Sequence, residues 1–163
     1  MSNLFLPVII YRYSRIVMPN KDCELPAFLP PDGKIREILE RYKTIVVVGL
    51  SQHPEKPSHF VSKYLKEHGY NIIPVNPNTQ EPLLGEQVYP TLSEVPQEVE
   101  VVNIFRPAED VPAIVNEAIS IGVKVIWMQE GIVHNQAARQ AMDAGITVVM
   151  NRCMMKEHRR LKG

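Results

Sequence analysis

The sequence predicts an α/β fold: a doubly wound parallel sheet of at least five strands with helices on both faces. Short runs of almost continuous Val and Ile alternate with segments whose apolar residues recur at helical spacing, and such strands are typical of a parallel sheet covered on both sides. The clearest unit is residues 44–78, where an apolar strand runs into Gly49, an amphipathic helix follows and a second strand returns. This turn is typical of sheets that present a helix N-terminus to a phosphate.

The predicted strands are apolar runs that follow one another without a repeat or a low-complexity linker. They lie at residues 45–48, 71–75, 99–105, 123–128 and 146–150. Pro74 is unusual in such a run because proline has no N–H to pair with a neighbouring strand. We expect Pro74 to be compatible with the second strand because it lies near the end of that strand.

The helices are predicted from apolar residues at helical spacing. Ahead of the sheet, a short helix that Asp32 is expected to cap carries one apolar face, made of Ile35, Ile38, Leu39 and Tyr42. Later helices are predicted to begin at Pro57 and to run over residues 111–119, 137–142 and 154–161. Carboxylates suit the first turn of a helix, where Glu109 and Asp110 are expected.

The start of the chain differs from the rest. We expect residues 1–33 to be an N-terminal arm and lead-in loop, and residues 34–163 to be a single domain. Residues 4–17 are apolar, but they fall short of the roughly 20 residues of a membrane helix and lack a signal-peptide pattern. We expect an extra strand or arm on the body or on a second subunit of a homodimer, or an extension ahead of a start at Met18.

Composition excludes several kinds of partner. Lys plus Arg and Asp plus Glu are balanced at 18 each, so no basic field for nucleic acid is expected. Cys23 and Cys153 form neither a metal-binding spacing nor a disulfide framework, and no two histidines are four residues apart. We therefore expect a cytoplasmic protein without a metal site, a nucleic-acid partner or a membrane partner.

Polar residues collect directly after the predicted strands. In doubly wound sheets the ligand binds beyond the carboxyl ends of the strands, so we expect a ligand site on this rim. The clusters are Gly49-Leu50-Ser51-Gln52-His53, Asn76-Pro77-Asn78, Arg106-Pro107, Gln129-Glu130-Gly131 and Asn151-Arg152-Cys153.

The first cluster favours a phosphate ligand but not NAD. Gly49 permits a tight turn, Ser51 offers a hydroxyl and Lys56 a positive charge, although only the first glycine of a dinucleotide GxGxxG motif is kept. NAD usually meets an Asp or Glu about 20 residues after that motif. Here the second strand leads into Asn76, and no carboxylate follows before Glu81. Neutral amides there would tolerate a phosphorylated ribose.

Three rim residues have alternative interpretations. Arg106 is either held at the rim by the strand before it or a solvated arginine near a helix start. Glu130 could be a general base, but without a partner it is better read as a turn or capping residue. Arg152 and the start of a helix would favour the thiolate of Cys153, which otherwise is an inert, half-buried thiol. No catalytic constellation is visible, so we expect no enzyme.

Five segments in the same order extend the interpretation. They are VVVGLS (46–51), GYNIIPVNP (69–77), NIFRP (103–107), WMQEGI (127–132) and NRCMMKEHRRL (151–161). With them the chain resembles the stand-alone CoA-binding domain family (YccU-like proteins). It is more distantly similar to the N-terminal domain of the succinyl-CoA synthetase α subunit.

The resemblance implies a Rossmann-like domain that holds the ADP end of coenzyme A, or of an acyl-CoA, without catalysis of its own. By position, it places Gly49, Leu50, Ser51, Gln52, His53 and Lys56 at the phosphates. It places Val75, Asn76 and Asn78 beside the adenosine, with Arg106 and Pro107 near the ligand. It places Gln129, Glu130, Gly131, Asn151, Arg152 and Cys153 along the pantetheine.

The chain also departs from the synthetase pattern. It has fewer glycines in the first loop and lacks the second domain with the phosphorylated histidine. Three alternatives stay open beside simple CoA binding. Cys153 could pair reversibly with the CoA thiol, the protein could be an NAD(P)-dependent or acyl-CoA-processing enzyme, or it could supply the CoA site of a split acyl-CoA ligase.

Overall fold

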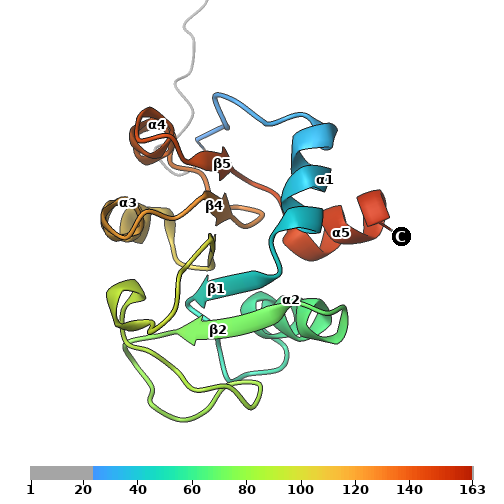
Figure 1. Ribbon diagram of the computed structural model, residues 1–163, viewed down its shortest axis with the longest axis vertical. Helices are drawn as coiled ribbons and strands as arrows, with labels where there is room; N and C mark the ends of the chain where they lie inside the picture. The colour runs from blue at the N-terminus through green and yellow to red at the C-terminus, as the bar shows by residue number, and fades with distance from the viewer. Residues whose placement is uncertain (1–23, 163) are drawn as a thin grey trace, which may run out of the picture.

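Five parallel strands form one sheet in the order β2-β1-β3-β4-β5 (Figure 1). The computed structural model describes residues 24–162. Within them lie β1 (Thr44–Val48), β2 (Asn71–Val75), β3 (Val101–Ile104), β4 (Val125–Met128) and β5 (Thr147–Val149). Every neighbouring pair is parallel. The predicted α/β sheet is confirmed, and Pro74 is accommodated because β2 is an edge strand.

Helices cover both faces of this sheet (Figure 1). One face carries α1 (Asp32–Arg41), α2 (Pro57–Glu67) and α5 (Met154–Lys162), and the other carries α3 (Val111–Ser120) and α4 (Asn135–Asp143). Each face encloses its own apolar core, with Leu65 and Trp127 in the first and Val115 and Ala138 in the second. Because α2 and α3 lie on opposite faces, a topological switch point falls between the carboxyl ends of β1 and β3.

The strands are shorter than the apolar runs that predicted them. The predicted runs 99–105, 123–128 and 146–150 extend beyond β3, β4 and β5. Val99 and Val123 are buried in the core without belonging to a strand. Apolar runs predict burial, whereas pairing ends where the neighbouring strand ends, as in the register of β1 with β3 from Ile45↔Val101 to Val48↔Ile104.

Two predictions about helix starts are wrong. Pro31 is the N-cap of α1, and Asp32 is the first helical residue. The Asp32 carboxylate instead accepts two hydrogen bonds from Arg160, both at 2.6 Å. Glu109 and Asp110 lie in a 3-10 turn, Ala108–Asp110, ahead of α3. A proline in the first two positions of α3 sets the start of that helix.

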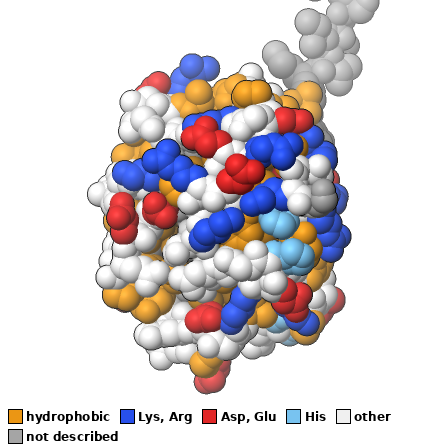
Figure 2. Space-filling view, turned by 45° about the vertical axis from the view of Figure 1, so that its right-hand side comes forward, with side chains coloured by type: hydrophobic (Ala, Val, Ile, Leu, Met, Phe, Trp, Pro, Cys, Tyr) orange, Lys and Arg blue, Asp and Glu red, His pale blue; other side chains and the backbone are white. Residues whose placement is uncertain are grey.

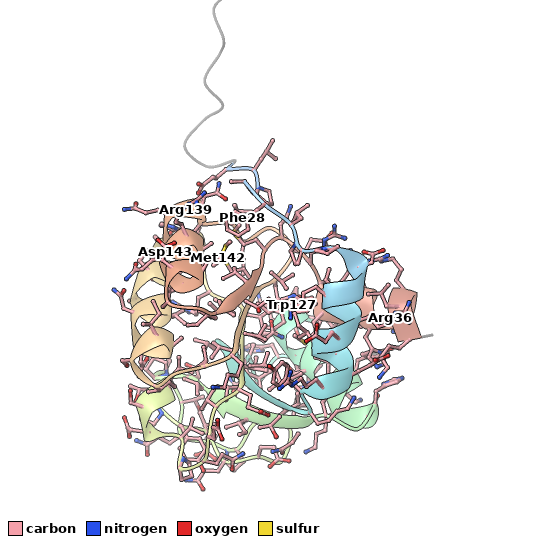
Figure 3. All side chains as sticks on the ribbon, turned by 45° about the horizontal axis from the view of Figure 1, so that its top comes forward. Phe28, Arg36, Trp127, Arg139, Met142 and Asp143 are labelled. Atoms are coloured by element: carbon pink, nitrogen blue, oxygen red, sulfur yellow. The ribbon has the colours of Figure 1, made fainter. Side chains whose placement is uncertain are left out.

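Residues 24–30 form the lead-in loop, which lies against α4 (Figure 3). Asn135 holds it by accepting from the Ala27 N–H and donating to the Leu25 carbonyl, both at 2.8 Å. Phe28 packs on the core beside Met142. The predictions for residues 4–17 and Met18 fall outside the described residues, and the division at residue 33 stays a prediction. Over residues 24–162, no helix has the length and apolarity to cross a membrane.

A cluster of aromatic and histidine rings joins α2 to α5. Tyr64 stacks on His68 with ring centroids 3.9 Å apart, and its hydroxyl lies 3.0 Å from Nδ1 of His158. Histidine side chains are gathered among lysines and arginines on this face (Figure 2). Burial, together with the charges of His68, Lys162 and Lys43, lowers the pKa of His158.

We expect this cluster to make folding depend on pH. Because the folded-state pKa of His158 is lowered, the unfolded chain binds that proton more readily, so the stabilisation is complete above about pH 6.5 and is lost as pH falls through the folded-state pKa. Denaturant unfolding between about pH 8 and about pH 5 measures this loss. The free energy of unfolding of His158→Gln should depend less on pH than that of the wild type. His53→Gln, a variant at an exposed site, should show the same pH dependence as the wild type. An unchanged pH dependence in His158→Gln would contradict the assignment.

Candidate functional site

Two cavities open at the carboxyl-end rim of the sheet, and Gly49 lines both. The larger, about 530 Å³, lies between the first turns of α2 and α5, and we call it the α5 cavity. The smaller, about 340 Å³, lies between the end of β2 and the start of α3, and we call it the α3 cavity. Both therefore flank the switch point, where ligands of doubly wound sheets bind.

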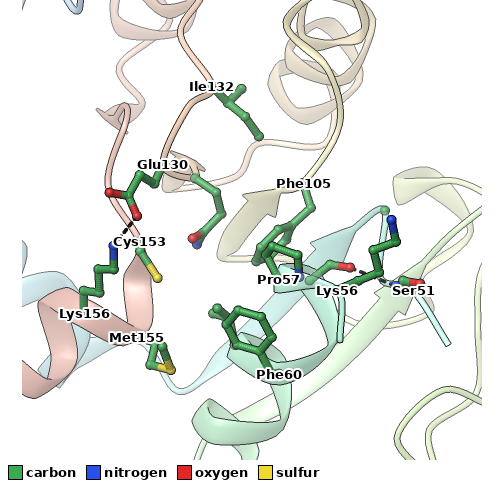
Figure 4. Close-up of a pocket in the computed structure, with 14 residues that line it drawn as sticks. Ser51, Lys56, Pro57, Phe60, Phe105, Glu130, Ile132, Cys153, Met155 and Lys156 are labelled. Carbon is green, nitrogen blue, oxygen red and sulfur yellow. Dashed lines mark hydrogen bonds and ion pairs between the residues drawn. The ribbon is translucent and has the colours of Figure 1, made fainter. Parts of the chain in front are cut away.

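The α5 cavity is formed by two helix N-termini and an apolar wall (Figure 4). A helix N-terminus carries partial positive charge and unpaired N–H groups, which favour an anion. Lys56 adds a full positive charge at the start of α2, and within residues 24–162 it makes no ion pair. The residues of the two helix starts are Lys56, Pro57, Ser58, Cys153, Met155 and Lys156; those of the wall are Phe60, Val61, Phe105 and Ile132.

The loop after β1 is fixed by hydrogen bonds to α2 and to β2. Gly49 adopts φ +88° and donates its N–H to the Val75 carbonyl at 2.9 Å. The Ser51 N–H donates to the Ser58 hydroxyl at 3.0 Å, and a ring nitrogen of His59 donates to the Ser51 carbonyl at 2.9 Å. These hydrogen bonds fix the loop at the cavity that Gly49 and Ser51 line.

A buried polar chain reaches the α5 cavity from inside the sheet. Gln129, only 4% exposed, lines the cavity and donates its Nε2 to Oδ1 of Asn103 at 2.8 Å. That bond leaves the Gln129 side-chain oxygen without a partner among the described residues. Asn103 is fully buried in β3, and its amide lies 4.0 Å from the sulfur of Met154. Asn103 was missed from the sequence, although it is the one polar residue of β3.

Glu130 and Lys156 form an ion pair across the mouth of the α5 cavity (Figure 4). The carboxylate and Nζ are 2.5 Å apart. The hydrogen bond to Glu130 raises the pKa of Lys156, so the lysine stays charged. Glu130 lies in a turn, as the sequence analysis favoured, and its side chain also lines the cavity together with that of Lys156 from α5.

Asn151 and Arg152 hold the rim loops together rather than line a cavity. Asn151, at φ +55°, accepts the Gly131 N–H on Oδ1 at 2.8 Å. The Arg152 carbonyl accepts the Trp127 ring N–H at 2.6 Å, and its guanidinium lies 3.3 Å from Glu157. The guanidinium is therefore paired with Glu157. Cys153 is 8% exposed, which is more buried than the half-buried thiol considered from the sequence.

The α3 cavity carries Arg106 together with an acidic partner. Nε and Nη2 of Arg106 lie 2.9 and 2.7 Å from the Asp110 carboxylate, so the arginine is held at the rim but its charge is shared. Glu117, on the same wall, accepts two hydrogen bonds from Ser93 at 2.9 Å. Val75 and Asn76 form the opposite side. This cavity suits an uncharged group better than a phosphate.

The structure thus divides the predicted rim residues into three groups. Those that line the α5 cavity are Gly49, Ser51, Lys56, Gln129, Glu130 and Cys153. Those that line the α3 cavity are Gly49, Val75, Asn76 and Arg106. Those that line neither are Leu50, Gln52, His53, Asn78, Pro107, Gly131, Asn151 and Arg152. Leu50 is fully buried, because the loop turns it into the core.

Several lining residues were not predicted as part of the site. Met155 and Lys156 could have been found, because they follow Cys153 in the first turn of a helix that starts at the rim. Phe60 and Ile132 carry no such signal, since their place depends on how α2 and the loop after β4 pack. Residues that line the cavity only because of how the elements pack cannot be predicted from the sequence pattern of strands and turns.

This geometry defines an α/β protein with two cavities at its switch point. A sequence model described as "CoA binding domain" matches residues 43–159. The chain belongs to this family, which confirms the resemblance to CoA-binding domains.

The relatives are either proteins that this chain matches over nearly their whole length or longer ligase chains of which it matches one part. The chain is 40% identical over 129 residues to the "Uncharacterized protein YneT" of Bacillus subtilis, which covers 79% of this chain and 95% of that one. It is 36% identical over 95 residues to the ADP-forming acetate–CoA ligase I subunit alpha of Pyrococcus furiosus, over 55% of this chain but 21% of the subunit. A solved hypothetical protein from Pyrococcus horikoshii OT3 matches at TM-score 0.81 and 44% identity, covering 86% of this chain and 98% of that one.

Proposed function

We propose that this protein binds coenzyme A, or an acyl-CoA, through its ADP moiety at the carboxyl-end rim, without a catalytic step of its own. The observation that carries the proposal is the pair of cavities that share Gly49 at the switch point. Membership of the CoA binding domain family supports the choice of ligand. A long ligand with a nucleotide at one end and a thiol arm at the other fits two adjoining cavities of different character.

The phosphates are assigned to the start of α2. There the fixed loop Gly49–Ser51, the helix N-terminus and Lys56, which pairs with no carboxylate of residues 24–162, all favour negative charge. The adenosine is assigned to the α3 cavity beside Val75 and Asn76, with Arg106, Pro107 and Asn78 at its edge. Asn76 there donates to the Leu50 carbonyl at 3.0 Å and carries no charge.

This assignment distinguishes coenzyme A from NAD. The ribose of coenzyme A carries a phosphate, which a carboxylate after β2 would repel and neutral Asn76 tolerates; we assign this phosphate to the rim outside the α3 cavity, because Glu109 and Glu117 line that cavity. The carboxylate that normally binds the ribose of NAD is missing at this position. An NAD-dependent enzyme is therefore the weaker alternative.

The pantetheine arm is assigned to the α5 cavity. Its amides can hydrogen-bond the free side-chain oxygen of Gln129, and its methyl groups can pack on Phe60 and Ile132. The thiol end then lies toward Cys153. A cytoplasmic location and a homodimer remain predictions of the same proposal.

The placement of the phosphates is tested by Lys56→Ala. We expect the dissociation constant for CoA to rise about tenfold, because a charge-assisted contact is lost, and the difference to shrink as salt is raised. The matched control is Lys63→Ala on the same helix, whose lysine pairs with Glu67 at 3.9 Å and lines neither cavity. Equal affinities in both variants, measured by calorimetry, would contradict the placement.

A second candidate function is the CoA-site subunit of a split acyl-CoA ligase. The similarity to the alpha subunit of the Pyrococcus furiosus acetate–CoA ligase favours it. It predicts a stable complex with a nucleotide-grasping partner chain, and acyl-CoA formation only when both are mixed. Affinity purification from the native cell followed by mass spectrometry tests this. A chain that is recovered alone would contradict it.

A further inference from the structure

The sulfur of Cys153 lies in the wall of the α5 cavity (Figure 4). Cys153 immediately precedes α5, and its carbonyl accepts the Glu157 N–H at 3.0 Å, which fixes the backbone that carries the thiol. The residue is 8% exposed. Met155, Phe60 and Lys156 line the same cavity. A reagent therefore reaches this thiol by entering the cavity.

A second feature marks the same wall as a place for a ligand. Gln129 lines the cavity and is 4% exposed, and among the described residues its side-chain oxygen accepts no hydrogen bond. Since this oxygen is not a buried unsatisfied atom, it is accessible and free to accept a hydrogen bond from a ligand or from water. The thiol thus lies beside a polar atom that is suited to an amide N–H of a bound ligand.

We propose that Cys153 undergoes thiol–disulfide exchange with the disulfide of oxidised coenzyme A, which stores CoA on the protein as a mixed disulfide. This inference rests on the proposed function, because the ADP moiety must first be held at the rim. It deepens that function by adding a covalent, reversible state of the same site.

The exchange balances without a further oxidant. The Cys153 thiol loses its proton to solvent, and the thiolate attacks one sulfur of the CoA disulfide. The S–S bond of the CoA disulfide breaks, a bond forms between Sγ of Cys153 and that sulfur, and the other CoA leaves as a thiolate that takes up a proton. Free CoA or another thiol reverses the step by attacking the mixed disulfide.

Burial gives the exchange its selectivity. A disulfide whose ADP moiety is bound at the rim is presented to the thiol at a high effective concentration, whereas a disulfide without that moiety must enter by chance. CoA disulfide should therefore react with Cys153 faster than glutathione disulfide does.

The test uses the full chain with Cys23→Ser, which leaves Cys153 as its one cysteine, and the same chain with Cys153→Ser added as control. Each is treated with CoA disulfide or with glutathione disulfide and followed by intact-mass spectrometry. We expect the first chain to gain the mass of one CoA less two hydrogens, about tenfold faster than it gains glutathione. Added CoA analogue without the thiol should slow the reaction, and the double variant should gain nothing.

A parallel titration of Cys23→Ser with CoA in reducing buffer separates the two proposals. If CoA binds but CoA disulfide gives no adduct, or reacts no faster than glutathione disulfide, the exchange is overturned and the proposed function stands. If CoA does not bind and no adduct forms, both are overturned. Adduct formation that the thiol-free analogue blocks supports both.

Discussion

Replacing Gly49 with alanine is expected to weaken CoA binding at least tenfold and to lower the free energy of unfolding by about 2 to 3 kcal/mol. Gly49 adopts φ +88°, and an added Cβ would lie 2.9 Å from Cδ of Arg106 and 3.2 Å from the Phe105 carbonyl oxygen. Arg106 could yield only by straining its exposed pair with Asp110, and the Phe105 oxygen belongs to the backbone and cannot move by itself. The loop that both cavities share would therefore have to move.

Gly145→Ala provides the matched control. Gly145 has a similar φ of +83°, but no atom lies within 4 Å of its added Cβ. Its free energy of unfolding should fall by only about 1 to 2 kcal/mol, the cost of placing alanine in the left-handed backbone region. It should bind CoA with the affinity of the wild type. Denaturant unfolding and calorimetry on both variants measure the two effects. Equal losses of stability with unchanged CoA affinity would show that the close approach at Gly49 is unimportant.

Glu157→Gln is expected to destabilise the fold by about 2 kcal/mol. The Glu157 carboxylate is 6% exposed and lies 3.3 Å from Arg152 and 2.6 Å from Arg160. Arg160 also pairs with Asp32, so the network ties α5 to α1. Removing the buried anion leaves two guanidinium groups close together without the charge between them. Both remain partly accessible to water, so the loss is smaller than for a fully buried pair.

The comparison for this prediction is Glu86→Gln. Glu86 pairs with Lys66 at 2.6 Å, but both side chains are more than a third exposed. An exposed pair contributes little, so we expect a change below about 0.5 kcal/mol. Thermal and denaturant unfolding of the two variants measure both losses of stability, so that they can be compared directly. A loss in Glu86→Gln as large as in Glu157→Gln would contradict the role assigned to burial.

The fold could be predicted from the sequence because local patterns and topology agree. Continuous apolar runs such as 45–48 and 71–75 indicate strands buried on both faces, and the helical spacing between them requires parallel crossovers. Strand ends could not be predicted, because Val99 and Val123 are as buried as their paired neighbours. The start of α3 at residue 111 was predicted correctly, whereas the capping role of Asp32 and the place of Glu109 and Asp110 in the first turn of α3 were not, because Pro31 is the N-cap of α1 and a 3-10 turn precedes α3.

The rim could be predicted, but its division into cavities could not. The carboxyl ends of strands identify Gly49, Gln129 and Cys153, because topology alone brings strand ends together. Whether a side chain there faces a ligand depends on hydrogen bonds that the sequence does not reveal. The Asn151 side chain accepts the Gly131 N–H, and the Arg152 guanidinium donates to Glu157. Lys156, which belongs to a helix, lines the cavity instead.

Calorimetric titration of the purified protein with coenzyme A, after any bound ligand has been removed, tests the central claim most directly. NAD serves as the control ligand, since it shares the ADP moiety but lacks the ribose phosphate and the pantetheine. We expect a dissociation constant in the micromolar range for CoA, about 8 kcal/mol of binding free energy, and no heat with NAD. Heat with NAD and none with CoA would contradict the account.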